Sequence, residues 1–164
     1  MEIGDEAPRF ELPDTDGRLH GPDGVTVVAF TCNHCPYALG WHDALIQVAR
    51  DYEQVTFLAV NPNDAERYPA DSYEAMKERV RADGGWPHPY LRDESQEVAR
   101  AYGAKTTPDL FLLDAGGRLR YRGAPDSDRQ RAGWLRAALD SVLAGRDPQP
   151  PETDPVGCSV KWKQ

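Results

Sequence analysis

The sequence lacks the features typical of membrane and nucleic-acid-binding proteins. No apolar stretch in its 164 residues approaches the roughly 20 residues that a membrane-spanning helix needs. The formal net charge of -8, without a run of Lys and Arg, argues against a nucleic acid or a membrane as partner, because both attract basic surfaces. The acidic segment 1–8 has no apolar signal-peptide core. We therefore expect a soluble, cytoplasmic protein with one globular domain.

Cysteine is also scarce, with only Cys32, Cys35 and Cys158 in the chain. In a protein without a secretion signal, three cysteines do not indicate a structural disulfide framework. A Cys-x-x-Cys pair in a reducing compartment is more often catalytic or metal-binding. The pair of Cys32 and Cys35 is therefore the first candidate for chemistry.

This pair lies between a predicted strand and a predicted helix. The apolar, β-branched run 25–30 predicts a buried strand, and apolar residues at helical spacing predict a helix over 36–52. We expect Cys32 at the exposed start of that helix, where unpaired N–H groups and the helix dipole lower the pKa of a thiol. Cys35 is expected one turn further in, more buried and protonated.

The rest of the chain alternates strand and helix signals. A small hairpin closing at Asp16-Gly17 comes first, and a capping box of Asp71 and Glu74 opens a helix after the second central strand. The further expected elements are a strand over 54–60, a short strand over 89–91, a short helix over 93–102, a β-hairpin over 110–122 and a helix over 127–143. This order predicts an α/β fold in which a mixed β-sheet is flanked by helices on both faces.

The element order, with Cys32-Asn-His-Cys-Pro36 after the first central strand and Thr107-Pro108 before the hairpin, resembles the thioredoxin fold. The segment 4–17 resembles the opening of the redoxin branch, the AhpC/TSA, peroxiredoxin-like proteins. A narrower similarity, to a peroxiredoxin-like subgroup of thioredoxin-family proteins, is carried by the Cys-Asn-His-Cys-Pro motif and by the segments 107–114, 121–123 and 155–162, the last with its Gly-Cys-Ser-Val-Lys-Trp tail.

The resemblance implies a domain organisation and a set of roles. It implies a thioredoxin-like (redoxin) domain over 1–147, with an N-terminal redoxin-type extension, and an extended tail over 148–164. It also implies that Cys32 attacks a substrate disulfide and that Cys35 resolves the mixed disulfide.

His34 lies between the two cysteines and could tune their chemistry. A protonated imidazole beside Cys32 stabilises its thiolate and makes the dithiol pair more oxidising. The alternative is a solvated His34 without any effect on the redox couple.

Thr107-Pro108 resembles the cis-proline loop that faces the cysteines in this fold. The backbone of Thr107 could then pair with an extended substrate segment as an added strand. The alternative is a trans-proline that begins an edge strand.

Cys158 follows a proline-rich connector, 148–155, which is stiff and long enough to reach the active site. One hypothesis makes Cys158 a third redox thiol that traps Cys32 or Cys35. The other makes it a small apolar residue packed beside Trp162.

The leading functional hypothesis is a thiol–disulfide oxidoreductase with a Cys32/Cys35 couple and no cofactor. Its expected partners are a disulfide-containing protein or small molecule and a cellular thiol reductant. A thiol-dependent peroxidase is the first alternative, although the pattern Pro-x-x-x-Thr-x-x-Cys is absent. A copper- or zinc-binding or delivery protein using Cys32, His34, Cys35 and Cys158 is the second. We predict no metal site, because no second Cys-x-x-Cys or spaced His pair completes one.

Overall fold

The computed structural model describes all residues, 1–164, and is built around one five-stranded sheet. The strand order is β5-β4-β3-β7-β8, with β3 in the centre. β3 pairs in parallel with β4, and β4 with β5, while β7 and β8 add antiparallel strands. The strands are β3 (Thr26–Phe30), β4 (Thr56–Asn61), β5 (Tyr90–Arg92), β7 (Asp109–Leu113) and β8 (Leu119–Gly123). The predicted mixed sheet is confirmed.

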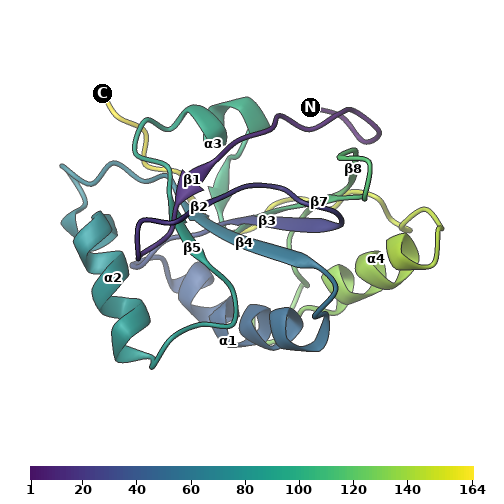
Figure 1. The fold of residues 1–164 in the computed structure, drawn as a ribbon. Coiled ribbons are helices and arrows are strands. Elements are labelled where there is room, and N and C mark those ends of the chain that lie inside the picture. Colours follow the sequence, from purple (N-terminus) through teal and green to yellow (C-terminus); the bar gives the residue numbers. More distant parts are fainter.

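Helices cover both faces of this sheet, as Figure 1 shows. The helices are α1 (Pro36–Asp51), α2 (Tyr73–Ala82), α3 (Glu97–Tyr102) and α4 (Gly133–Leu143), and a 3-10 turn, η1 (Pro69–Asp71), precedes α2. α1 and α4 pack on one face, α3 on the other, and α2 lies near the β5 edge. The predicted arrangement of helices is therefore also confirmed.

Packing between α1 and α4 depends on one large aromatic side chain. Trp41 of α1 is 1% exposed and lies in the core cluster that also contains Leu135 and Leu139 of α4. Its indole N–H donates to the carbonyl oxygens of Asp128 and Arg131, each at 2.9 Å. The buried indole thus keeps its hydrogen bond while the ring fills the core between the helices.

Two pairs of very short strands flank the main sheet. The N-terminal hairpin joins β1 (Leu12–Pro13) and β2 (Leu19–His20), as the turn at Asp16-Gly17 predicted. The second pair joins β6 (Thr106–Thr107) with β9 (Cys158–Ser159) in antiparallel register. Because β9 belongs to the tail, the tail lies against the segment that precedes β7. None of the helices has the length and apolar character to cross a membrane.

Candidate active site around Cys32 and Cys35

The two cysteines lie in the loop that joins β3 to α1. Cys35 is the N-cap residue of α1, and Pro36 is its first residue. Proline is favoured there, because its fixed φ suits the helix and its missing N–H would have had no intrahelical partner. Cys32 therefore lies before the helix, and the prediction that Cys32 begins the helix with Cys35 one turn inside is wrong.

Cys32 is not exposed either, since both Cys32 and Cys35 have 0% exposure. Burial and, to a smaller extent, the negative charge of Asp71 raise the pKa of the Cys32 thiol to about 11, although a hydrogen bond with Thr107 opposes both effects. The prediction of an exposed, acidic Cys32 is therefore wrong for this dithiol form, in which the thiol is sealed in an apolar cluster with Cys35 and Ala38.

Cys35 has the opposite tendency. Burial acts to raise its pKa, but a hydrogen bond from the Cys158 thiol and backbone N–H groups of Ala38, Cys158 and Tyr37 outweigh it and lower the pKa. Ala38 and Tyr37 belong to the first turn of α1. The helix N-terminus thus acidifies Cys35, the residue that caps it, rather than Cys32.

Thr107 touches both sulfur atoms. Its hydroxyl Oγ1 lies 3.3 Å from Cys32 Sγ, and its carbonyl oxygen accepts a hydrogen bond from Cys35 Sγ at 3.3 Å. The Thr107–Pro108 peptide bond is cis, as the resemblance implied, and Thr107 is fully buried. The structure therefore brings together the two motifs that the sequence separates by about seventy residues.

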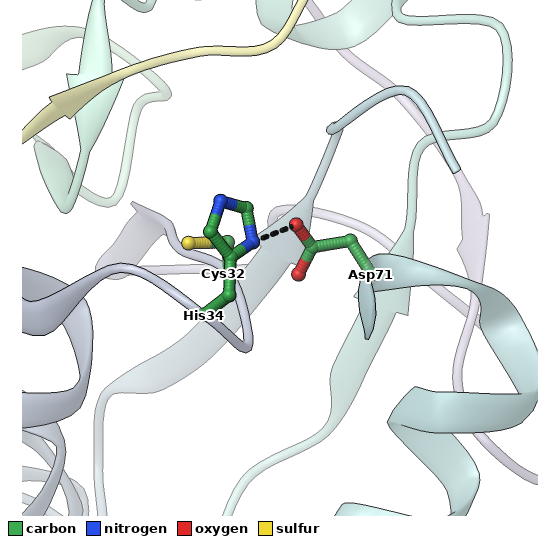
Figure 2. Close-up of side chains that lie close together, drawn as sticks. All are labelled: Cys32, His34 and Asp71. Atoms are coloured by element: carbon green, nitrogen blue, oxygen red, sulfur yellow. Dashed lines mark ion pairs between the residues drawn. The ribbon is translucent and has the colours of Figure 1, made fainter. Parts of the chain in front are cut away.

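His34 pairs with a buried carboxylate beside Cys32, as Figure 2 shows. His34 Nδ1 lies 2.5 Å from Asp71 Oδ2, and the imidazole stacks on the ring of Tyr68 at a centroid distance of 5.4 Å. The His34 side chain is 30% exposed and that of Asp71 is 0% exposed. The imidazole thus lies between solvent and a buried negative charge.

Asp71 collects hydrogen bonds from three asparagines. Its carboxylate accepts from the backbone N–H of Asn33 at 2.7 Å, from Asn61 Nδ2 at 3.2 Å and from Asn63 Nδ2 at 3.0 Å. The prediction that Asp71 caps α2 is wrong, because Ser72 is the N-cap residue and accepts from the N–H of Ala75. The Asp71 side chain instead turns inward to the cysteine loop.

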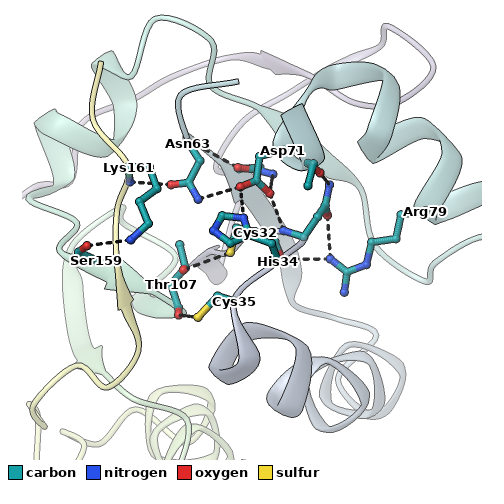
Figure 3. Close-up of polar contacts among 12 residues, drawn as sticks. Cys32, His34, Cys35, Asn63, Asp71, Arg79, Thr107, Ser159 and Lys161 are labelled. Carbon is teal, nitrogen blue, oxygen red and sulfur yellow. Dashed lines mark hydrogen bonds and ion pairs between the residues drawn. The ribbon is translucent and has the colours of Figure 1, made fainter. Parts of the chain in front are cut away.

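The cysteine loop is also held from the β5 edge of the sheet. Arg79 of α2 donates to the carbonyl oxygen of Cys32 at 3.2 Å and to Asn33 Oδ1 at 2.9 Å. Tyr90 of β5 donates its hydroxyl to the same Asn33 oxygen at 2.7 Å. Figure 3 shows how the contacts of Arg79 and Asp71 converge on the loop. Asn33 and His34, the two residues between the cysteines, are therefore both held by side chains from distant segments of the chain.

Cys158 lies at the same site. It is paired with Thr107 in the β6–β9 register and packs, partly exposed, against the cluster of Cys32 and Cys35. Trp162 packs instead against a separate cluster. The packing of Cys158 beside Trp162 that we considered is therefore wrong, and the reach of the tail to the active site is confirmed. Its hydrogen bond to Cys35 and its burial raise the pKa of Cys158.

The site contains one group of side chains that could hold a metal ion. Single donor atoms of Cys32, His34 and Asp71 lie within 4.8 Å of one another. This set differs from the one considered from the sequence, since Asp71 replaces Cys35 and Cys158. A structural zinc site almost always has four protein ligands, and this set offers three.

Sequence reasoning missed Asp71, Asn61, Asn63 and Arg79 as parts of the site. The signal available was positional: Asn61 ends β4, and the carboxyl ends of neighbouring parallel strands gather at one edge of a sheet, next to the loop after β3. Polar residues directly after an apolar strand run, such as Asn61 and Asn63, could have been assigned to that edge.

Together, the sheet, the Cys-x-x-Cys loop at the start of α1 and the cis-proline segment opposite it define a thioredoxin-like fold. The AhpC/TSA family model matches residues 3–122. The chain belongs to the AhpC/TSA family.

Solved structures share this fold over most of the chain. An uncharacterized conserved protein from Geobacillus kaustophilus is 42% identical with a TM-score of 0.90, over 99% of this chain and 93% of that one. The hypothetical protein SMc02350 from Sinorhizobium meliloti 1021 is 38% identical with a TM-score of 0.93, over 99% and 96%. A putative thioredoxin from Neisseria meningitidis is 25% identical with a TM-score of 0.69, over 87% and 92%.

A curated relative connects the family to redox chemistry. The thiol-disulfide oxidoreductase ResA of Geobacillus thermodenitrificans (strain NG80-2) is 28% identical over 127 residues, which are 73% of this chain and 68% of that protein. At the level of the family, the chain is thus related to thiol–disulfide oxidoreductases.

Proposed function

We propose that the protein is a thiol–disulfide oxidoreductase whose catalytic residues are Cys32 and Cys35. The observation that carries the proposal is that both sulfur atoms lie 3.3 Å from atoms of one residue, Thr107, next to cis-Pro108. Two thiols that meet at one residue are placed to form a disulfide with each other. The resemblance to ResA supports the same chemistry.

In the proposed reaction, the dithiol reduces a substrate disulfide. One thiolate of the pair attacks a substrate sulfur and releases the first substrate thiol, and the second thiolate attacks the mixed disulfide and releases the other. The products are a Cys32–Cys35 disulfide and two substrate thiols, which take up the two protons. A cellular thiol reductant then restores the dithiol.

His34 is the proposed tuning residue, and Asp71 positions it. Because Nδ1 of His34 faces the Asp71 carboxylate, the pair fixes the orientation of the ring within reach of Cys32. A protonated His34 would compensate the Asp71 charge, which otherwise raises the pKa of Cys32. The imidazole therefore favours the Cys32 thiolate and the reduced state of the couple.

Thr107 and Pro108 are the proposed substrate-facing residues, since Thr107 borders both sulfurs and Pro108 follows it through a cis peptide bond. The backbone edge at Thr107, where we expected a substrate strand, carries the protein's own β9. A substrate that pairs with Thr107 must therefore displace β9, and any other substrate must react beside it.

The test is a disulfide-reductase assay with insulin or a small aromatic disulfide as substrate and dithiothreitol as reductant. Cys32→Ser and Cys35→Ser each abolish the activity above background, while Ser127→Ala, an exposed loop substitution, retains it. Thermal unfolding of each variant shows that the fold is intact. Full activity in a folded Cys35→Ser variant would contradict the proposal.

The metal-binding alternative is supported by one observation, the grouping of Cys32, His34 and Asp71 donor atoms. Metal analysis of protein purified without chelator tests it, and about one equivalent of copper or zinc would favour it. The peroxidase alternative gains no comparable support, because no threonine precedes Cys32 or Cys35 by three residues. Rapid peroxide consumption with a sulfenic acid at either cysteine would favour it.

A further inference from the structure

The tail strand β9 occupies the place where an extended substrate would add to the active site. Cys158 lies opposite Thr107 and Ser159 opposite Thr106 in the antiparallel pair. The strand approaches so closely that a Cβ atom on Gly157 would lie 2.2 Å from the carbonyl oxygen of Thr107. Only glycine fits at this contact without a shift of the backbone. The residue before Cys158 is therefore suited to close packing against Thr107.

The residues after β9 fasten the tail firmly to the domain. The backbone N–H of Lys161 donates to Asn63 Oδ1 at 2.9 Å, and Gln96 Nε2 donates to the Lys161 carbonyl oxygen at 2.9 Å. The Val160 N–H donates to the Lys105 carbonyl oxygen at 3.0 Å, and Val160 is 3% exposed. Figure 3 shows the tail, with Ser159 and Lys161, running beside the cysteines. The tail is thus an ordered wall of the site, held in place by these hydrogen bonds.

This wall presents a thiol to the buried pair. Cys32 and Cys35 are both 0% exposed, whereas Cys158 is partly exposed. Cys158 packs against the cluster that contains Cys35, and it is paired with Thr107, whose carbonyl oxygen accepts a hydrogen bond from Cys35 Sγ at 3.3 Å. Among the three cysteines, Cys158 is the one that is partly exposed, and it packs against the cluster of the other two.

We propose that Cys158 is the exchange thiol of the site: it reacts with an external disulfide and passes the oxidation to Cys35 through a Cys35–Cys158 disulfide. The proposal deepens the proposed function, and rests on it, by naming the residue through which the buried couple reaches its substrate. It also specifies the partner of Cys158 as Cys35, the sulfur beside it.

Each step is an ordinary thiol–disulfide exchange. Cys158, as thiolate, attacks one sulfur of a low-molecular-weight disulfide and releases the first external thiol. Cys35 attacks the Cys158 sulfur of this mixed disulfide, forms the Cys35–Cys158 bond and releases the second. Cys32 then attacks Cys35, forms the Cys32–Cys35 bond and returns Cys158 as a thiol. One external disulfide is reduced, one internal dithiol is oxidised, and the two protons leave with the external thiols.

The test uses oxidised glutathione with the full-length protein, N-ethylmaleimide quenching and tryptic digestion without reductant. Cys32 and Cys35 both lie in the tryptic peptide 19–50, and Cys158 lies in the peptide 147–161. A Cys35–Cys158 disulfide therefore joins two peptides, whereas a Cys32–Cys35 disulfide only lowers the mass of one. We expect the joined peptides transiently in the wild-type protein and as the accumulating product in Cys32→Ser.

A control moves the thiol to the other face of the tail. Neighbouring residues of a strand point to opposite faces, so a Cys158→Ser, Ser159→Cys double variant keeps a tail thiol but directs it away from Cys35. In the Cys32→Ser background, this variant is expected to form a glutathione adduct without joined peptides. Joined peptides from it at the wild-type rate would show that tethering alone, and not the position of Cys158, produces the bond, and would overturn the proposal.

The remaining outcomes separate this proposal from the proposed function. If the Cys32–Cys35 disulfide forms, while joined peptides are absent both from early wild-type samples and from Cys32→Ser, the exchange role of Cys158 is wrong and the Cys32/Cys35 couple stands. If no intramolecular disulfide forms in any variant, both are wrong. If Cys158→Ser oxidises Cys32 and Cys35 as fast as the wild type does, the exchange role is overturned as well.

Discussion

His34 and Asp71 form a close pair in which an imidazole nitrogen lies 2.5 Å from a fully buried carboxylate oxygen. The carboxylate is also the acceptor for Asn33, Asn61 and Asn63, so its position is fixed independently of the histidine. A buried carboxylate needs such partners, because desolvation of an unpaired charge is costly. The pair therefore places an imidazole beside a polar hydrogen-bond network next to Cys32.

Removal of the imidazole should make the dithiol less oxidising. In His34→Ala, the charge of Asp71 faces Cys32 without compensation, which disfavours the thiolate and hence the reduced state. We expect the reduction potential to fall by roughly 30 mV, which corresponds to about 1.4 kcal/mol for a two-electron couple. Equilibration with glutathione measures it.

His20→Ala is the matched control, because His20 pairs with Asp14 at 2.7 Å in the N-terminal hairpin, away from the cysteines. Its potential should equal that of the wild type. An unchanged reduction potential in His34→Ala would show that this histidine does not tune the redox couple.

Neutralisation of Asp71 should acidify Cys32. The negative charge of Asp71 raises the pKa of this thiol, so Asp71→Asn is expected to lower it below its wild-type value of about 11. The pH dependence of alkylation by iodoacetamide, in a Cys35→Ser, Cys158→Ser background, reports the pKa of Cys32 alone. The lost acceptor should also cost about 1–3 kcal/mol of unfolding free energy.

Asp14→Asn removes a carboxylate from another His–Asp pair, that of His20, and should leave the Cys32 profile unchanged. A Cys32 pKa that stays the same, or rises, in Asp71→Asn would contradict the electrostatic role given to Asp71.

A methyl group at position 157 should loosen the tail. The Cβ of Gly157→Ala would lie 2.2 Å from the Thr107 carbonyl oxygen, a backbone atom that cannot move as a side chain can. We expect a loss of about 1–3 kcal/mol in unfolding free energy and faster hydrogen exchange at the Val160 N–H, which bonds to Lys105 across β6–β9.

Gly40→Ala is the control, since a Cβ there meets only ordinary contacts at 3.6 Å and lies within α1. Its Val160 exchange should match the wild type. Unaltered exchange in Gly157→Ala would show that the close contact does not hold β9 in place.

Asp109 should make the stability depend on pH. Asp109 follows cis-Pro108 and is fully buried, and burial raises its pKa to about 6, although hydrogen bonds from the N–H groups of Lys105 and Thr106 oppose this. A raised pKa in the folded state gives stability that is complete below the unfolded pKa of about 4 and is lost as pH rises to about 6.

Asp109→Asn should therefore gain, relative to the wild type, about 3 kcal/mol between pH 4 and pH 7. Urea unfolding at several pH values measures the difference between the two curves. Parallel curves across this range would contradict a buried, protonated Asp109.

Local sequence patterns predicted the scaffold well. The apolar run 25–30, the helical stripe containing Trp41 and the hairpin signals after Pro108 each depend on neighbouring residues, and each forms the expected element. The Cys-x-x-Cys pair was placed correctly at the junction of β3 and α1. These features follow from local periodicity and turn chemistry, which a single sequence contains.

The environment of the cysteines could not be predicted from local sequence patterns. Asp71 contacts His34 from 37 positions away, and its spacing to Glu74 matched a capping box, although Ser72 is the N-cap residue of α2. The burial of Cys32 depends on contacts with Thr107 and on the tail around Cys158. Exposure and pKa are set by tertiary contacts, so the motif identified the sulfurs but not their acidity.

The central claim, a redox couple of Cys32 and Cys35, is tested most directly by equilibrating the wild-type protein with glutathione buffers of graded potential. Non-reducing mass spectrometry of peptide 19–50 then follows the loss of two hydrogens that marks the internal disulfide. We expect one two-electron transition to a Cys32–Cys35 disulfide that dithiothreitol reverses. A peptide that gains only glutathione adducts, or stays a dithiol at the most oxidising potential, would contradict it.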